Sequence, residues 1–300
     1  MAAKKATKTI KITSSVARTD DGTIQINITL PKEMVEAEKK NVVKEAIKTT
    51  EVPGFRKGKA PLSKVEEQIP EKDMRVQIVN NIAPQAFGQA ISDNKIQPAI
   101  YPRIEILQAE KGEPWELRAS TCEMPEIKLG DYKKEIKGEL SSKSIWTPEK
   151  GKKDKEEKKE MSQMDKEQVV INVLVKTTTI KIPNILIEAE VSESLSQLLD
   201  KLDKLGLTLD SYLESIGKTP TELREEYEQR AKDSLTMTLA LNKIVEEEDI
   251  QVTDEEIESA LNIATTDPNA TPGGSDEEKK RVIASILRRR KALDSLTNLN

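Results

Sequence analysis

The sequence predicts an α+β domain, built on an antiparallel sheet with an inserted helix-loop-helix, followed by an all-α domain with long arm-like helices. Strict alternation of apolar and polar residues, typical of strands, occurs over residues 23–30 and returns over 103–124. Elsewhere apolar residues recur at helical spacing. Because 34% of the residues are charged and only 36% are hydrophobic, long solvated helices are favoured over one large core.

The first predicted element is a β-hairpin with one buried face. Ile24, Ile26 and Ile28 alternate with polar residues, and Asp21-Gly22 marks a tight turn before them. From Pro31 the apolar spacing changes to that of a helix, which continues to about residue 49.

A second helical stretch is expected after residue 61. Ser63 and Glu66 have the spacing of a capping box, and the stretch runs to about Asp93 with breaks at Pro70 and Pro84. The strands predicted from "RIEILQ" and "EPWELRASTCEM", joined by a turn at Gly112, should then pair with the first hairpin. Residues 1–135 therefore form the predicted α+β domain.

The rest of the chain is predicted to be a linker and a helical domain. Residues 136–166 are dense in charge with almost nothing to bury, so they indicate a charged linker or spacer. Residues 167–300 are helical, although the β-branched run over 169–183 is compatible with a short extended piece. Capping boxes mark three helix starts, at Thr219 with Glu222, Thr253 with Glu256, and Ser275 with Glu278.

Composition excludes several kinds of chemistry. Histidine is absent and Cys122 is the single cysteine, so a His/Cys metal site, a Cys-His nucleophile and a disulfide scaffold are excluded, and we expect no metal and no cofactor. No Gly-rich substrate loop accompanies the many carboxylates, which argues against an enzyme. No apolar run is long enough to span a membrane and no signal peptide is recognised, so a cytoplasmic protein is expected.

One short segment stands out, "GFRKGKAP" over residues 54–61, which we call the basic loop. It is not a nucleotide-binding loop, because only three residues separate its glycines and Ala60 follows Lys59 where a Ser or Thr is required. On residue types alone, two interpretations are equally supported. Gly54 and Pro61 simply end and begin helices, or the cations meet RNA phosphates while Phe55 stacks or fills a pocket on a protein.

The basic loop is similar to the Gly-Phe-Arg-x-Gly-Lys-x-Pro signature of trigger factor, a bacterial chaperone that docks beside the ribosomal exit tunnel. Weaker similarities to this family lie in "MPEIKLGDYK" (124–133), "IKIPNILIEAEV" (180–191) and "TPTELREEYEQRAKDSL" (219–235). The resemblance implies that the loop cations contact ribosomal RNA and that Phe55 contacts ribosomal protein at the tunnel exit. The implied ribosome-binding residues are Gly54, Phe55, Arg56, Lys57, Gly58, Lys59 and Pro61.

The sequence departs from that family in one respect. Trigger factors usually carry an FKBP-type peptidyl-prolyl isomerase domain, an aromatic-lined β-sheet pocket, between their two other parts. Between Asp131 and Val170 there are instead about forty residues that are mostly Lys and Glu, with Trp146 as the one tryptophan. The sequence is therefore expected to be a shortened trigger factor without isomerase activity.

The expected function is a ribosome-associated chaperone that shields apolar segments of nascent or unfolded polypeptides. Leucine and methionine stripes in residues 167–300 are candidate client contacts, although such stripes ordinarily form core. Two alternatives remain open, a ribosome-independent holdase or assembly chaperone and an RNA-binding regulator, and the net charge of −5 disfavours the regulator. A homodimer is possible, and no membrane partner is expected. The candidate client-binding residues are Leu195, Leu198, Leu202, Met237 and Leu241.

Overall fold

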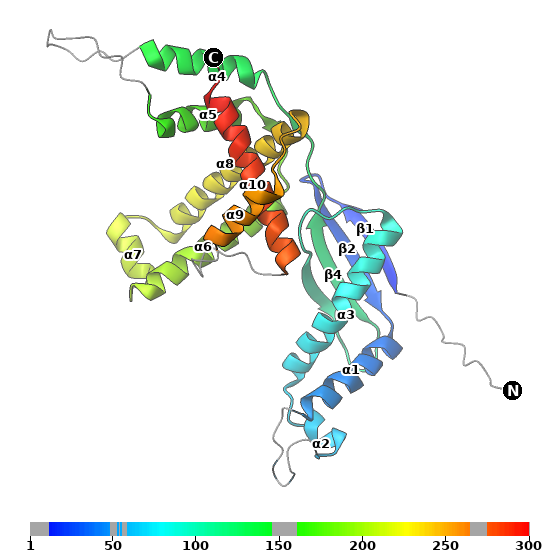
Figure 1. Cartoon of the computed structure of the whole chain (residues 1–300). Helices are drawn as coiled ribbons and strands as arrows, with labels where there is room; N and C mark the ends of the chain where they lie inside the picture. Colours follow the sequence, from blue (N-terminus) through cyan, green and yellow to red (C-terminus); the bar gives the residue numbers. More distant parts are fainter. Residues whose placement is uncertain are drawn as a thin grey trace. The chain divides into compact units, whose positions relative to one another are not determined.

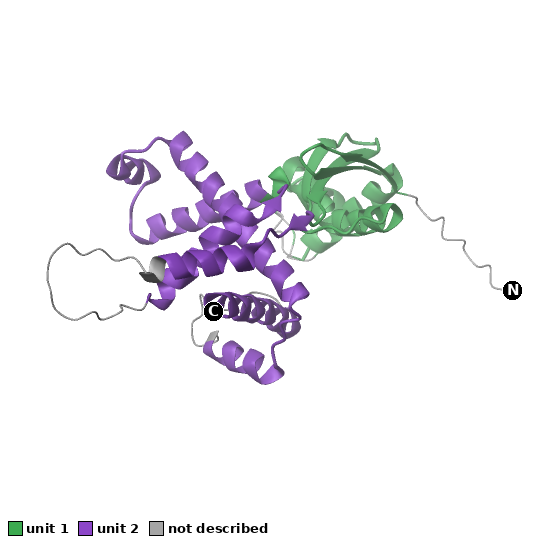
Figure 2. Cartoon of the chain, turned by 90° about the horizontal axis from the view of Figure 1, so that it is seen from above, with its two compact units in different colours: residues 1–124, 183–186 green, residues 125–182, 187–300 purple. Residues whose placement is uncertain are grey.

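The computed structural model describes residues 12–48, 53, 55, 59–145, 161–264 and 275–299 (Figure 1). They divide into two compact units, residues 1–124 with Pro183–Leu186, and residues 125–182 with 187–300 (Figure 2). The predicted fold class, an α+β part followed by an all-α part, is confirmed. The predicted domain boundary at residue 135 is replaced by one after Met124, because the helix that follows buries its apolar side chains within the second unit.

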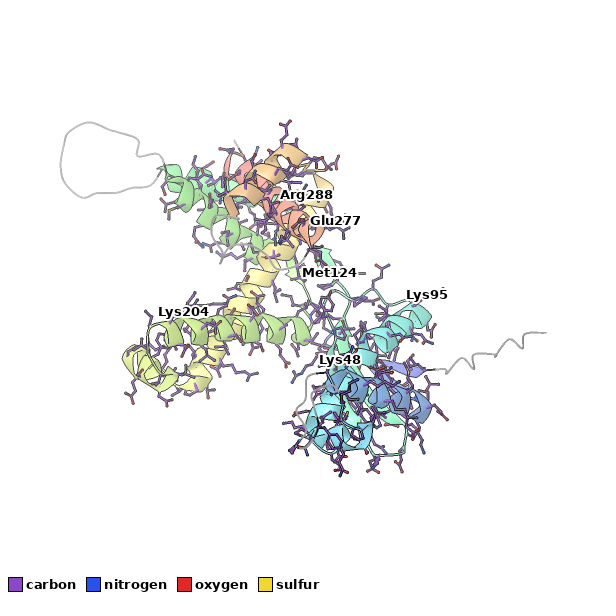
Figure 3. The ribbon with its side chains drawn as sticks, turned by 60° about the horizontal axis from the view of Figure 1, so that its bottom comes forward. Lys48, Lys95, Met124, Lys204, Glu277 and Arg288 are labelled. Carbon is purple, nitrogen blue, oxygen red and sulfur yellow. The ribbon has the colours of Figure 1, made fainter. Side chains whose placement is uncertain are left out.

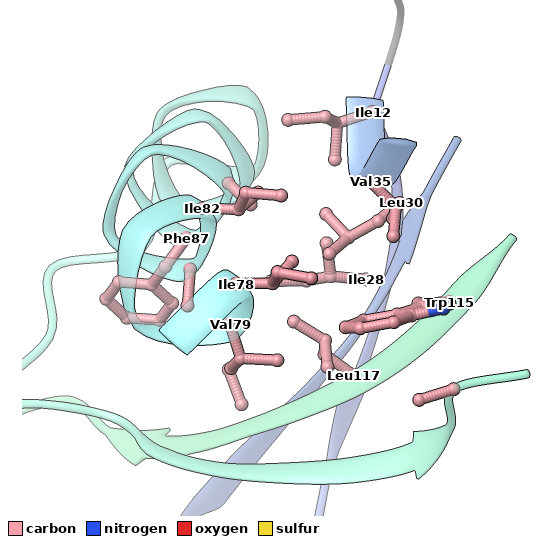
Figure 4. Close-up of a cluster of buried hydrophobic side chains, with 14 of the residues drawn as sticks. Ile12, Ile28, Leu30, Val35, Ile78, Val79, Ile82, Phe87, Trp115 and Leu117 are labelled. Atoms are coloured by element: carbon pink, nitrogen blue, oxygen red, sulfur yellow. The ribbon is translucent and has the colours of Figure 1, made fainter. Parts of the chain in front are cut away.

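The first unit contains an antiparallel sheet of four strands in the order β1-β2-β4-β3. Helix α3 lies across one face of this sheet (Figures 1 and 4). The helices of the unit occupy the middle of its sequence, so the inserted helical excursion predicted between the strands is present. Its elements are β1 Thr13–Arg18, β2 Thr23–Leu30, α1 Lys32–Ala46, α2 Leu62–Glu66, α3 Glu71–Asn94, β3 Arg103–Gln108 and β4 Trp115–Cys122.

The predicted hairpin turn is held by Asp21. Its carboxylate accepts hydrogen bonds from the Thr23 amide at 3.1 Å and the Thr23 hydroxyl at 2.9 Å, and from the Thr19 hydroxyl. These bonds, with that of Thr19 the strongest, lower the pKa of Asp21. Gly22 has a φ of +87°, which favours glycine at this position.

The strand pairing follows the predicted apolar faces. In the β2/β4 register Ile26 lies opposite Ala119, Ile28 opposite Leu117, and Leu30 opposite Trp115. All six side chains are buried in one cluster with residues of α1 and α3 (Figure 4). Each pair places apolar side chains on the face covered by α3, which explains why strict alternation predicted this face correctly.

Two predictions about the helices of this unit are wrong. Helix α3 continues through Pro84 without a break. Proline removes one backbone hydrogen bond, but Ile78, Ile82 and Phe87 on both sides of it are buried against the sheet, and this packing keeps the helix continuous. The Ser63–Glu66 capping box is absent because Pro61 precedes the first residue of α2.

The second unit is mostly helical. Its strands β5 and β6 pair only with each other. Pro183–Leu186, around the start of α6, group with the first unit. The elements are β5 Ile127–Lys128, α4 Tyr132–Ile145, α5 Gln163–Thr177, β6 Thr179–Ile180, α6 Asn184–Lys204, α7 Leu209–Ile216, α8 Pro220–Glu247, α9 Asp254–Ala264 and α10 Asp276–Thr297.

Helix α4 is part of the second unit's core and not of a linker. Ile136 is fully buried in a cluster shared with α5, α8 and α10, and Tyr132 is buried beside it. Lys133 pairs with Glu248 at 2.8 Å, which ties α4 to the end of α8 and raises the pKa of Lys133. Of the predicted linker, residues 146–160 lie outside the described residues. The apolar stripe of α4 is not evident from the sequence, because Ile136 and Leu140 are separated by Lys and Glu in a segment dense in charge.

The β-branched run over 169–183 is mainly helical. Val169, Val170 and Val173 are buried on one face of α5, and the extended piece is limited to the two residues of β6. These valines are buried against α4, α8 and α10, and this packing outweighs the preference of valine for strands.

The three predicted helix starts are confirmed. Glu222, Glu256 and Glu278 each accept a hydrogen bond from the backbone amide of the capping residue, at 2.8, 2.9 and 2.8 Å. Hydrogen bonds from those amides are the first cause that lowers the pKa of Glu222 and Glu278. Since the folded-state pKa is lowered, these caps contribute their full stability above the ordinary carboxyl pKa, and this contribution is lost as the pH falls through the folded-state pKa.

Candidate functional site

The basic loop connects two helices that are packed together. Val43 of α1 and Val65 of α2 are buried in the same cluster, and Lys39 pairs with Glu66 at 2.5 Å across the two helices. Pro61 is the N-cap residue of α2 and has the φ of −59° that proline imposes. Helices α1 and α2, before and after the segment that contains the loop, are therefore packed against each other.

Three of the described residues of the loop carry exposed side chains. Phe55 is 45% exposed, and Lys59 and Pro61 are also exposed. Figure 3 labels Lys48, the last described residue before the segment that leads to the loop. An exposed phenylalanine and an exposed lysine in one short loop are suited to contact a protein and an anionic surface. The remaining predicted ribosome-binding residues, Gly54, Arg56, Lys57 and Gly58, lie outside the described residues.

The predicted client contacts differ in exposure. Leu202 and Leu241 are only 4% and 5% exposed, so they are core residues in this conformation. Leu195 and Met237 are half-buried against the two clusters of the second unit, and Leu198 is half-buried. The predicted contacts therefore mainly pack within the unit. Leu195 lies in a cluster of α6 and α8, and Met237 and Leu241 lie in the cluster shared by α4, α5, α8 and α10.

A different set of apolar side chains is exposed in this unit, around the connection from α6 to α7. Leu205 is 72% exposed in the segment after Lys204, which Figure 3 labels at the end of α6. Its neighbours in the set are between 36% and 47% exposed. We call this set the apolar tip: Leu199, Leu205, Leu207, Leu209 and Ile216.

The apolar tip lies outside the predicted client contacts, although the sequence contains a signal for its exposure. Gly206 has a φ of +68° and ends the helix, yet leucines lie on both sides of it. Turns are usually polar because a turn has no second layer to bury its side chains. Leucines around a turn therefore indicate a surface that serves something other than the protein's own core.

Ion pairs cover the polar face of α8 near this region. Glu226 lies 2.5 Å from Arg230 and also pairs with Lys218, and the hydrogen bond from Lys218 is the first cause that lowers the pKa of Glu226. The Arg230 guanidinium lies 5.6 Å from the Tyr227 ring centre. These exposed pairs contribute solubility more than stability.

The described residues contain no group of three metal-ligating side chains. Burial raises the pKa of the Cys122 thiol to about 11, so this cysteine is not a reactive nucleophile. Within the described ranges, no helix combines the length and the apolar character needed to cross a membrane.

Two family profiles match the chain. "Bacterial trigger factor protein (TF)" matches residues 12–158, and "Bacterial trigger factor protein (TF) C-terminus" matches residues 149–298. Curated trigger factors are 40% identical over 89 residues in Limosilactobacillus reuteri, covering 30% of this chain and 20% of the relative, and 35% identical over 108 residues in Staphylococcus epidermidis, covering 36% and 25%. The matched stretch thus spans a fifth to a quarter of the relatives' own length.

A solved structure has the same fold. It is described as "Promiscuous Substrate Recognition in Folding and Assembly Activities of the Trigger Factor Chaperone" and aligns with a TM-score of 0.56 at 14% identity, over 96% of this chain and 100% of that chain. The C-terminal profile alone covers half of the chain, and the two profiles together leave only its ends unmatched. The chain therefore belongs to the bacterial trigger factor family.

Proposed function

We propose that this protein is a cytoplasmic, ribosome-associated molecular chaperone that binds unfolded or nascent polypeptides. The observation that carries the proposal is the complete loop signature, set between two packed helices in a chain that both trigger factor profiles match. The ribosome-binding residues are Gly54, Phe55, Arg56, Lys57, Gly58, Lys59 and Pro61.

Client binding is assigned to the apolar tip together with the half-buried Leu195, Leu198 and Met237. Leucine and methionine contacts tolerate many partner sequences because they are adaptable and non-directional. Leu202 and Leu241 keep a structural role, since both are buried and Leu241 packs in the cluster shared by α4, α5, α8 and α10.

The experiment is co-sedimentation of the full chain with ribosomes over a range of salt concentrations. We expect the chain to pellet with ribosomes at low salt and to be released as salt rises, because Arg56, Lys57 and Lys59 displace counterions from RNA phosphates. Three such contacts give a slope of roughly −2 to −3 in a plot of log affinity against log salt concentration. A chain that protects clients but never pellets would instead be a ribosome-independent holdase or assembly chaperone.

We further propose that the protein has no prolyl isomerase activity. The two profiles meet at residues 149–158, and the described residues from 125 to 182 form two helices and a two-stranded pair. With aromatic residues at 3% of the chain, an aromatic-lined pocket has little to be built from. A proline-limited peptide assay should give the uncatalysed rate, and a clear multiple of that rate in a preparation free of other isomerases would contradict the assignment.

A further inference from the structure

The first unit contains a pocket whose lining includes no described residue of the basic loop and none of the apolar tip. It holds about 520 Å³ and is lined by α1, α2, α3 and the turn between β3 and β4. This volume lies within the range of small-ligand and peptide side-chain sites. Six of its apolar lining residues are Val35, Val43, Leu62, Met74, Ile78 and Trp115.

The pocket interior is apolar and belongs to the rigid core. Val43, Met74 and Ile78 are each at most 5% exposed, so their positions are fixed by packing. The Trp115 indole Nε1 donates to the Glu110 carbonyl at 3.2 Å, which satisfies its polar atom. Helix α2 has only five residues and leaves Leu62 46% exposed beside the pocket. An apolar side chain entering here gains contact without displacing any hydrogen bond of this indole.

Of the described residues, four cations and four carboxylates line the pocket, and three of the carboxylates are held in ion pairs. Lys39 is paired with Glu66 at 2.5 Å, and Arg75 with Glu71 at 3.0 Å. Glu36 lies 3.8 Å from Lys32. Within the described residues, the lining cations Lys40 and Lys111 make no ion pair, and Glu110 is the one lining carboxylate in the same position. The unpaired charge at the rim is therefore net positive.

We propose that this pocket binds an apolar or aromatic side chain of an unfolded polypeptide that carries an acidic residue next to it. The apolar lining accepts the side chain, and Lys40 and Lys111 attract the carboxylate. The inference rests on the proposed chaperone function for its ligand. It adds a client site in the first unit, where Leu62 follows directly after Pro61 of the basic loop.

Trp115 provides a direct reporter of this site. In a Trp146→Phe background it is the remaining tryptophan of the two in the chain. The probe is a short capped peptide with adjacent phenylalanine and leucine and one neighbouring aspartate. We expect saturable binding that changes Trp115 fluorescence, and we expect the same peptide with lysine in place of the aspartate to bind more weakly. Absence of saturable binding of the acidic peptide overturns the proposal, and equal binding of both peptides overturns the role of the two lysines.

A matched pair of variants separates the pocket from general surface effects. Leu62 and Val76 are 46% and 44% exposed, but only Leu62 lines the pocket. Leu62→Glu should weaken peptide binding about tenfold or more, because it places a carboxylate in an apolar site near an acidic ligand, whereas Val76→Glu should leave it unchanged. Lys40→Glu with Lys111→Glu should abolish the preference for the acidic peptide. Equal weakening by Leu62→Glu and Val76→Glu would overturn the assignment.

Other occupants give different results in the same experiments. Tighter binding of decanoate than of the peptide would show an amphiphile site, and a dimer that Leu62→Glu dissociates in sedimentation would show a second copy as the occupant. Either result overturns the peptide assignment. Peptide titration needs no ribosome, so the two proposals can fail separately. If the peptide does not bind but the chain still pellets with ribosomes, the docking proposal stands. If the peptide binds but the chain does not pellet, only the docking proposal is refuted.

Discussion

Replacing Phe55, Arg56 and Lys57 together by alanine is expected to weaken ribosome binding about a hundredfold or more, since each well-placed anchor residue of an interface contributes about 2 kcal/mol. The triple variant loses an exposed aromatic side chain and two of the three loop cations. Folding should be unaffected, because the packing of α1 against α2 through Val43 and Val65 lies outside the substituted segment.

The measurement is co-sedimentation with ribosomes at low salt, together with circular dichroism of the unbound variant. A matched control replaces Lys72, Tyr101 and Arg103 by alanine, which also removes one aromatic side chain and two cations. All three are exposed on the first unit, and Tyr101 is 97% exposed. If the control loses as much binding as the loop variant, non-specific charge and not the loop attaches the protein to the ribosome.

Sequence reasoning succeeded where one local rule decided the structure. The alternation over β2 and β4 fixed the buried face, because a shift by one residue would expose Ile26, Ile28 and Leu117. The capping boxes fixed three helix starts for the same reason, as each is completed within four residues.

It failed where tertiary packing outweighed a local preference. Pro84 does not break α3 because the sheet holds both halves of the helix, and the valines of α5 are helical because three other helices surround them. The sequence predicts a linker where residues 136–145 form most of helix α4, since the partners of Ile136 come from segments far along the chain. These partners cannot be read from the spacing of the α4 residues themselves.

The client contacts also depend on packing partners that residue spacing does not reveal. Helical spacing identifies an apolar stripe such as Leu195, Leu198 and Leu202, but does not show whether another helix covers it. In the structure Leu195 packs against side chains of α8 and Leu202 is buried, whereas Leu199 on the same helix is 47% exposed. The pocket beside Trp115 was equally out of reach of the sequence, because its lining comes from four separate segments.

Core and tip residues of the helical unit should respond in opposite ways to truncation. Ile244 is fully buried in a cluster with Ile136, Leu174 and Leu296, so Ile244→Ala should lower the free energy of unfolding by about 2 to 5 kcal/mol. Leu205 is 72% exposed, and Leu205→Ala should change it by no more than about 0.5 kcal/mol. Urea unfolding followed by circular dichroism measures both.

Client protection should show the reverse order at temperatures where both variants are folded. A variant with Leu205→Ser and Leu207→Ser removes the two tip leucines in the segment around Gly206 and should prevent less aggregation of a chemically denatured client, because apolar area available to the client is lost. Light scattering at several ratios of chaperone to client measures this, with the exposed Val282→Ser and Ile286→Ser on α10 as a control of equal chemistry in the same unit. Undiminished protection by the tip variant, or an equal loss in the α10 control, would remove the apolar tip from the client-binding surface. Full protection by folded Ile244→Ala would still be expected, since that side chain contacts only the protein's own core.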